Sequence, residues 1–284
     1  MATVPTPTKT ASVLFFYYGD SKFLTVFQET LRMKRAMEGY DTTVLLKHQE
    51  TPSSIDISEA DERNADIVDT PTQANLFKYL IQVAQSGHMI DLWIFSHGGT
   101  GGMRSSKGTH GQNDTVTAQE ITTELSPAKT GLTKLPIRML WSTLCYGSTL
   151  NNAWTSIGAK AVAGARTVNF FPNQFGRFAD EWGKGDVTFS QALDRSNTAQ
   201  SRALVHTAML AHALGTRGKW GGCPVGRTIL GKHDCAKAYF TQTWYERDSD
   251  YHDDLDGGEN MNFGSEKIVA GTGSLTKNSR PSWA

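Results

Sequence analysis

Hydrophobic runs alternate with stretches of helical spacing along the first two thirds of the chain. The runs are almost wholly apolar and rich in β-branched and aromatic residues, and they span 11–19, 41–48, 89–99, 137–147 and 159–168. Continuous apolar runs of this length are typical of strands that are buried on both faces of a parallel sheet. The pattern therefore predicts parallel strands at these positions.

Between these runs, the apolar residues follow helical periodicity. In 21–40, Phe23, Phe27 and Leu31 recur at four-residue steps, which predicts an amphipathic helix that ends near Gly39. In the next segment, Thr70 is predicted as the N-cap, with Pro71 in the first turn, Gln73 completing a capping box and Gly87 ending the helix. Its predicted inner face consists of Leu76, Tyr79, Leu80 and Val83.

Further along the chain, Thr117 and Glu120 form a second capping box, which predicts a short helix that ends before Pro127. Helices are also predicted over 148–158 and over 189–214, where Gly215 follows. Residues 49–69 are polar and acidic and predict a surface loop. The Gly/Ser-rich stretch 100–114 has few apolar anchors, and we expect a mobile loop there that could act as a lid or a self-cleavage site.

Strand and helix thus alternate several times, which predicts an α/β fold with a mostly parallel central sheet and helices on both faces. After Gly215 the sequence becomes rich in glycine and charged residues. We therefore expect a disordered lead-in over 1–10, one domain over 11–215, and an irregular extension over 216–284. Trp220, Trp244 and Tyr245 are the residues expected to pack this extension on the core.

Charge and hydropathy exclude some classes of protein. The 28 Lys and Arg residues equal the 28 Asp and Glu residues, so no basic excess is present to bind nucleic acid or an anionic membrane surface. No apolar run reaches the roughly 18 residues that a membrane span needs, and the polar N-terminus does not resemble a signal peptide. We therefore expect a cytoplasmic protein.

The chain contains three cysteines, Cys145, Cys223 and Cys235. Such a small odd number does not indicate a disulfide framework, although Cys223 and Cys235 could remain thiols, pair, or flank a metal. The acidic stretch 248–259 does not fit an EF-hand loop and is interpreted as a solvated loop. We therefore predict no metal and no cofactor.

Two of the apolar runs end on a reactive side chain followed by glycine: "IFSHGG" (94–99) and "LWSTLCYGS" (140–148). In a parallel sheet, active sites form beyond the carboxyl ends of the strands, and consecutive strands are usually neighbours. The sequence therefore predicts that His97 and Cys145 meet across a small cleft.

This pair of residues suits nucleophilic catalysis. A thiol attacks as its thiolate, and an imidazole can take the thiol proton or protonate a leaving group. A helix predicted directly after Cys145 would favour the thiolate through its dipole. The amides of Gly98 and Cys145 are candidate oxyanion donors, because glycine allows a close approach of the backbone.

"SHGG" and "CYGS" at the ends of successive strands resemble the caspase-type cysteine peptidases, the wider group with metacaspases, legumains, clostripain, gingipains and separases. A histidine about 50 residues before the nucleophilic cysteine matches the spacing of that group. The resemblance covers roughly 11–215 in its order of elements. It implies a caspase-like α/β/α sandwich, with His97 as catalytic histidine and Cys145 as nucleophile. It also implies cleavage of a protein or peptide substrate through an acyl-enzyme, without a cofactor.

The chain departs from that group in detail, since Leu144 precedes the cysteine and the Gln-Ala-Cys-x-Gly string of true caspases is absent. The resemblance implies a specificity pocket built from Tyr18, Gly19 and Asp20, from Ser142 and Thr143, and from the loop around 169–177. Asp20 or Asp180 would select a basic residue at the cleaved position through charge pairing.

Two other interpretations remain open. "TLCYG" could be the nucleophile elbow of an α/β-hydrolase-like enzyme, with "HGG" as its oxyanion loop and His206, His212 or His233 as its base. Alternatively, the domain could be a catalytically silent scaffold that binds a partner. Substitution of His97 distinguishes the caspase-type peptidase from the α/β-hydrolase-like enzyme, because only the peptidase requires this histidine.

Overall fold

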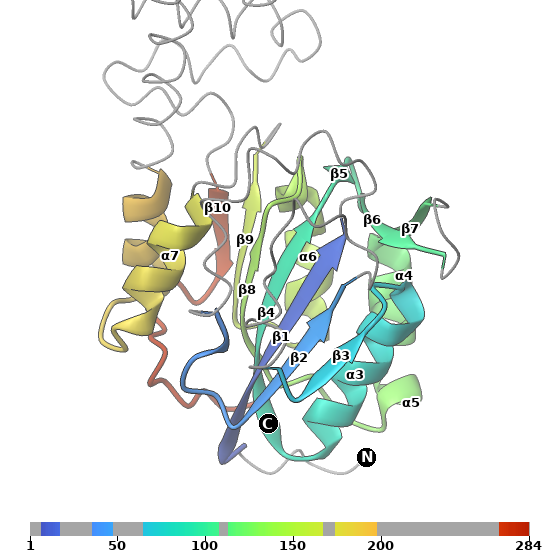
Figure 1. Cartoon of the computed structure of the whole chain (residues 1–284), viewed down its shortest axis with the longest axis horizontal. Helices are drawn as coiled ribbons and strands as arrows, with labels where there is room; N and C mark the ends of the chain where they lie inside the picture. Colours follow the sequence, from blue (N-terminus) through green and yellow to red (C-terminus); the bar gives the residue numbers. More distant parts are fainter. Residues whose placement is uncertain are drawn as a thin grey trace, which may run out of the picture.

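The computed structural model describes residues 7–17, 36–47, 65–107, 113–166, 174–197 and 267–283. These residues form an α/β fold around a seven-stranded sheet with the order β10-β9-β8-β4-β1-β2-β3 (Figure 1). The strands run parallel except β10, which pairs antiparallel with β9 at one edge. The predicted fold class, a mostly parallel sheet with helices, is confirmed.

Five of the seven strands, β1, β2, β4, β8 and β9, coincide with the five apolar runs. The bounds of all seven strands are β1 (Lys9–Tyr17), β2 (Thr42–Leu46), β3 (Ile67–Asp69), β4 (His88–Ser96), β8 (Ile137–Ser142), β9 (Ala161–Ala165) and β10 (Lys267–Gly271). The central strands β1, β4 and β8 are almost completely buried, which explains why their sequences are apolar without alternation.

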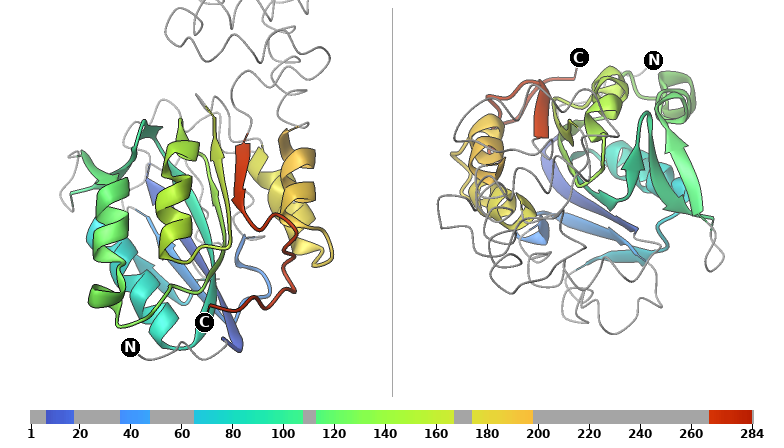
Figure 2. Two further views of the ribbon diagram at one scale, coloured as in Figure 1. Left: turned by 180° about the vertical axis from the view of Figure 1, so that it is seen from behind. Right: turned by 90° about the horizontal axis from the view of Figure 1, so that it is seen from above.

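Helices cover both faces of the sheet, and each face has its own hydrophobic core (Figure 2). On one face lie α3 (Gln73–Gln85), α4 (Ala118–Glu124), α5 (Pro127–Thr130) and α6 (Asn151–Ile157). On the other face lie α7 (Gln174–Gly183) and a helical segment over 189–197. This second core is rich in aromatic rings, with Phe175 packed edge-on against Phe95 at a centroid distance of 4.8 Å.

The predicted helix signals hold in part. The capping box of Thr117 and Glu120 is present and starts α4, and Leu76, Tyr79, Leu80 and Val83 are buried in α3 as predicted. The predicted N-cap of α3 was wrong, because Thr72 and not Thr70 caps it by accepting a hydrogen bond from the Asn75 amide. Ser106 explains this shift, since it bridges to Thr72 and donates its amide to the Pro71 carbonyl, which keeps that segment extended.

Two stretches that were expected to be loops contain strands. Within 100–114, β6 (Gly102–Ser106) pairs with β5 (Gly98–Gly99) and with β7 (Asn113–Thr117) in a three-stranded antiparallel sheet. The described part of the expected mobile loop is therefore a β-ribbon, which is held by backbone pairing and by the buried Met103 and Val116 rather than by a long apolar run. Within 49–69, β3 adds an edge strand to β2.

The C-terminal stretch also differs from the expectation of an irregular extension. Lys267–Gly271 is a regular strand of the central sheet, and the segment after it packs back on the domain through Trp283, whose indole donates to the Gly158 carbonyl at 2.8 Å. Most of the predicted helix 21–40, residues 198–214 and the residues Trp220, Trp244 and Tyr245 lie outside the described residues. Within the described ranges, no helix combines the length and apolarity needed to cross a bilayer.

Candidate active site

His97 follows the last residue of β4 at the carboxyl edge of the sheet. Its backbone is fixed by β6, because the Arg104 amide donates to the His97 carbonyl at 2.9 Å. The Ser96 hydroxyl donates to the Arg104 carbonyl at 2.8 Å and strengthens the same junction. The His97 side chain is half-buried. The β-ribbon thus holds the histidine at the rim of the sheet.

Cys145 follows β8, which is the parallel neighbour of β4. Backbone pairing continues beyond β8 itself, since the Thr143 amide donates to the Ile94 carbonyl at 2.9 Å and the Ser96 amide donates to the Thr143 hydroxyl at 3.1 Å. Cys145 is half-buried. The two predicted residues therefore lie at the same edge of the sheet, at the ends of adjacent strands.

Gly98 brings the two strand ends into direct backbone contact. A Cβ atom placed on Gly98 would lie 2.5 Å from the Cys145 carbonyl oxygen and 2.8 Å from the Leu144 Cβ. Real Cβ atoms do not approach other atoms so closely, so position 98 accommodates only glycine without a shift of the cysteine loop. The glycine that follows the histidine therefore sets the spacing between His97 and the loop of Cys145.

The chain turns sharply directly after Cys145. Tyr146 adopts a left-handed conformation with φ of 53°, and within the described ranges it is the one non-glycine residue with positive φ. The turn leads into the 3-10 helix η2 (Gly147–Leu150), which continues as α6. A strained residue held by its surroundings is a frequent property of functional sites. The arrangement is a strand, a tight turn that carries the cysteine, and a helix start.

Small residues and one threonine hold this turn in place. A Cβ atom on Gly164 of β9 would collide with the backbone of Gly147 and Ser148, so η2 can lie directly on the sheet. The Thr149 hydroxyl donates to the Tyr146 carbonyl at 2.7 Å and accepts from the Gly101 amide at 2.9 Å. This hydroxyl therefore ties the cysteine turn to the turn between β5 and β6.

The amide of Gly98 is directed away from the neighbouring strand β6. The bond from the Arg104 amide to the His97 carbonyl flanks the pair formed by Gly98 and Met103, so this is a non-hydrogen-bonded pair of the antiparallel ladder. In such a pair the amide points outward from the ladder. The Gly98 N–H is therefore not bonded to β6, which is a requirement for an oxyanion donor.

Lys267 lies close to Cys145 although sequence analysis did not identify it. Its side chain is 2% exposed, and its Nζ lies 4.8 Å from the centroid of the Trp141 ring. Burial lowers the pKa of the Lys267 ammonium to about 7, while the negative charge of Cys145 acts in the opposite direction and raises this pKa. A buried lysine with a perturbed pKa beside a cysteine thiol makes this edge a candidate functional site.

Tyr17, the last residue of β1, lies at the same edge of the sheet. It pairs in register with Ser96, directly before His97, and is 3% exposed. Burial raises the pKa of its hydroxyl, whereas the nearby Arg104 guanidinium lowers this pKa. The exposed Arg104 therefore faces the carboxyl edge and adds positive charge beside the histidine.

Ser142 and Thr143 are buried and bonded within the sheet. The Ser142 hydroxyl donates to the Ala163 carbonyl at 3.1 Å, and the Thr143 hydroxyl accepts from the Ser96 amide. Both side chains are less than 5% exposed. Their hydroxyls thus join β8 to its two neighbours, which does not fit the expectation that these side chains contact substrate.

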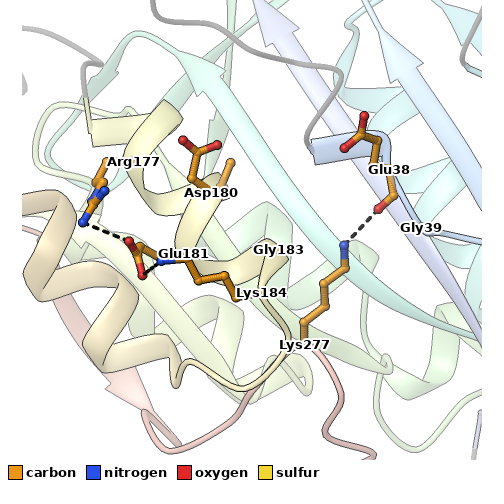
Figure 3. A pocket seen from close by; sticks show the side chains of 9 residues that line it. Glu38, Gly39, Arg177, Asp180, Glu181, Gly183, Lys184 and Lys277 are labelled. Carbon is orange, nitrogen blue, oxygen red and sulfur yellow. Dashed lines mark hydrogen bonds and ion pairs between the residues drawn. The ribbon is translucent and has the colours of Figure 1, made fainter.

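Asp180 lies apart from Cys145. It lines a cavity of about 570 Å³ together with Glu38, Lys184 and Lys277 (Figure 3). Glu38 precedes β2 and Lys277 follows the antiparallel β10, so this cavity opens at the amino edge of the parallel strands. Asp180 therefore lies toward the edge opposite the one that carries Cys145, which does not favour its expected role in specificity.

Charged groups around this cavity are already paired. Lys277 donates to the Glu38 carbonyl at 2.9 Å, and Glu181 forms ion pairs with Arg177 and Lys184 (Figure 3). Glu181 also pairs with Arg195. These charges lower the pKa of the Glu181 carboxyl, against the effect of burial, which raises this pKa. Charged residues that line the cavity therefore form structural ion pairs with Glu181.

Several candidates cannot be placed. Tyr18, Gly19, Asp20, Cys223, Cys235 and the acidic stretch 248–259 lie outside the described residues, as do His206, His212 and His233. The pocket loop expected over 169–177 is described only from Gln174, where α7 begins. Among the described residues, no group of three or more His, Cys, Asp or Glu side chains is arranged to hold a metal ion.

Searches of protein-family models and of curated proteins find no match to this chain. The functional assignment therefore depends on the chemistry and geometry of the site itself.

Proposed function

We propose that the protein is a cysteine endopeptidase of caspase-like architecture, with Cys145 as nucleophile and His97 as general acid and base. The observation that carries this proposal is the backbone contact of Gly98 with Cys145, which brings the half-buried histidine and cysteine together over two paired strands. A reactive pair at the carboxyl edge of a parallel sheet occupies the usual position of an active site in this class of fold.

In the proposed reaction, the Cys145 Sγ attacks the carbonyl carbon of the scissile peptide bond as a thiolate. The C–N bond then breaks, and His97 protonates the leaving amine. Water hydrolyses the resulting thioester, with His97 taking the proton of this water, and the carboxylic acid is released. The amides of Gly98 and Cys145 would stabilise the oxyanion in both steps.

The local structure supports a reactive thiol. The turn at Tyr146 leads from Cys145 into the start of η2 and α6, whose positive end favours a negative charge on sulfur. The proposal includes cleavage after a basic residue through Asp20 alone, because Asp180 lines the cavity at the amino edge of the sheet. No cofactor takes part in these steps.

The test compares single substitutions on a mixed peptide library. We expect Cys145→Ala and His97→Ala each to lower cleavage by at least about a thousandfold while the far-ultraviolet circular dichroism is retained. His88→Gln is the matched control, because His88 starts the same strand β4 and its ring bonds Ser86 and Thr42 at the opposite edge. Equal cleavage by the parent and by either active-site variant would refute the proposal.

A second candidate is an α/β-hydrolase-like enzyme that uses a later histidine. The strand, strained turn and helix around Cys145 favour it, because this is also the form of a nucleophile elbow. In that enzyme His97→Ala would leave most of the turnover intact, whereas Cys145→Ala would abolish it. The same experiment therefore separates the two enzymes, and a chain inactive with every substrate would indicate the binding scaffold.

A further inference from the structure

Lys267 is a buried cation for which the proposed dyad has no use. Within the described residues its Nζ makes no hydrogen bond and no ion pair, although the side chain is only 2% exposed. A buried ammonium without a partner is costly, so a chain that retains one needs a compensating interaction or a function for it.

The backbone of Lys267 is held firmly. Asn197 accepts a hydrogen bond from the Lys267 amide at 3.1 Å and donates to the Lys267 carbonyl at 3.2 Å. Gln174 of α7 in turn donates to Asn197 at 3.1 Å. Opposite Lys267, Ala165 supplies the pairing residue of β9. This clamp fixes the position from which the lysine side chain extends.

The sheet register places the lysine near the cysteine turn. Ala163 pairs with Trp141 of β8, so Ala165 and its partner Lys267 lie farther toward the carboxyl edge, level with the residues that precede Cys145. The Nζ lies 4.8 Å from the Trp141 ring centroid, which orients the side chain toward β8. The ammonium is therefore buried under the same rim that carries the thiol.

We propose that the Lys267 ammonium is the positioning charge that holds Cys145 as a thiolate, and that it acts through space rather than by proton transfer. In this arrangement His97 is left to serve the leaving amine and the attacking water. The Trp141 ring stabilises the ammonium through a cation–π contact. Because the surroundings are apolar, the attraction between the ammonium and the thiolate is weakly screened. The inference deepens the proposed function, on which its catalytic meaning rests.

No other charged group among the described residues that surround Lys267 could pair with its ammonium in place of Cys145. Among the described residues, Cys145 is the titratable group whose charge acts on Lys267. Trp141, Ala165 and Asn197, which pack on the lysine, carry no charge. The charged residues on the neighbouring segments are exposed, namely Arg166, Asp194 and Arg195.

The primary test measures alkylation of Cys145 by iodoacetamide in the full chain as a function of pH, with the modified peptide quantified by mass spectrometry. We expect Lys267→Met to raise the inflection of this profile by about one pH unit and to slow alkylation in slightly acidic buffer about tenfold. Lys160→Met is the matched control, because Lys160 also lies over a tryptophan ring, that of Trp283, but at the opposite end of β9. An unchanged inflection in Lys267→Met would overturn the inference.

A reciprocal measurement keeps the test valid if Lys267→Met does not fold. In protein labelled at lysine Cε, nuclear magnetic resonance follows the titration of Lys267 in the parent and in Cys145→Ala. Coupling between two charges is mutual, so loss of the thiolate must lower the pKa of Lys267. An identical titration in both proteins would refute the pairing. Neither readout requires peptidase activity. Coupling between Lys267 and Cys145 in a protein that cleaves no peptide would refute only the proposed function. Cleavage of peptides without this coupling would refute only the role of Lys267.

Discussion

Gly98 lies so close to Cys145 that a Cβ atom at position 98 would come within 2.5 Å of the cysteine carbonyl oxygen. The contact links the ends of β4 and β8 more directly than the strand pairing itself. The residue after the histidine therefore controls the geometry of the residue that carries the thiol.

The first prediction follows from this contact. Gly98→Ala should displace the Cys145 loop and lower peptide cleavage by about a hundredfold, since a displacement of about 1 Å in an active site has this effect. Gly99→Ala is the matched control, because a Cβ at Gly99 meets no atom within 4 Å and should leave activity unchanged. Equal losses in the two variants would show that the close approach of Gly98 has no special role.

The strained turn gives a second prediction. Tyr146 has a φ of 53°, a conformation that glycine adopts freely and that costs other residues about 1–2 kcal/mol. Tyr146→Ala removes the ring but keeps the strain, whereas Tyr146→Gly removes both. We therefore expect the glycine variant to be more stable than the alanine variant by about 1 kcal/mol in urea unfolding. Similar stabilities would argue against strain at this turn.

Lys267 makes stability depend on pH. Its pKa is about 7 in the folded chain, below its ordinary value of 10.5, so between these values the unfolded chain binds a proton that the folded chain does not. The free energy of unfolding must then rise with pH across this window and be lowest below it. Relative to Lys267→Met, the parent should gain up to a few kcal/mol between about pH 6 and about pH 9. A constant difference in urea unfolding between the two proteins would contradict this reasoning.

A buried ion pair beneath the site gives a fourth prediction. Arg138 of β8 donates to Asp91 of β4 at 2.8 and 2.7 Å, and Tyr40 and Trp182 also donate to this carboxylate. Both partners of the pair are fully buried. Removal of the cation by Arg138→Met leaves a buried carboxylate uncompensated and should lower the free energy of unfolding by about 3–5 kcal/mol.

The control for this pair is an exposed one. Lys129 and Glu124 lie 3.6 Å apart, and both side chains are largely exposed. Lys129→Ala should change the free energy of unfolding by less than about 1 kcal/mol. If Arg138→Met lowered the free energy of unfolding in urea no more than Lys129→Ala does, the hydrogen bonds and ion pair around Asp91 would not stabilise the fold.

The sequence predicted the central strands and the juxtaposition of His97 and Cys145, because both depend on local patterns. Buried parallel strands are continuous apolar runs, and residues after successive strands share one edge of the sheet. The β-ribbon of β5, β6 and β7 was missed because these strands are short and polar, and they are held by backbone pairing and a few buried side chains.

Lys267 was missed for a different reason. "KIVAG" is a short β-branched run within a stretch of glycine and charge, and its partner Ala165 lies about a hundred positions earlier. Nothing local indicates that distant pairing. The positions of Ser142, Thr143 and Asp180 could not be predicted for a similar reason, because hydrogen bonding inside the sheet and the direction of α7 are tertiary properties.

The late position of β10 has a consequence for biosynthesis. Among the described strands, β9 lacks its outer partner on a nascent chain until residues 267–271 are translated and dock against it. The lysine beneath the thiol arrives with that final strand. Under the proposed role of Lys267, a nascent chain holds His97 and Cys145 in place before their electrostatic environment is complete, and the thiolate is favoured in full only after translation has passed Gly271.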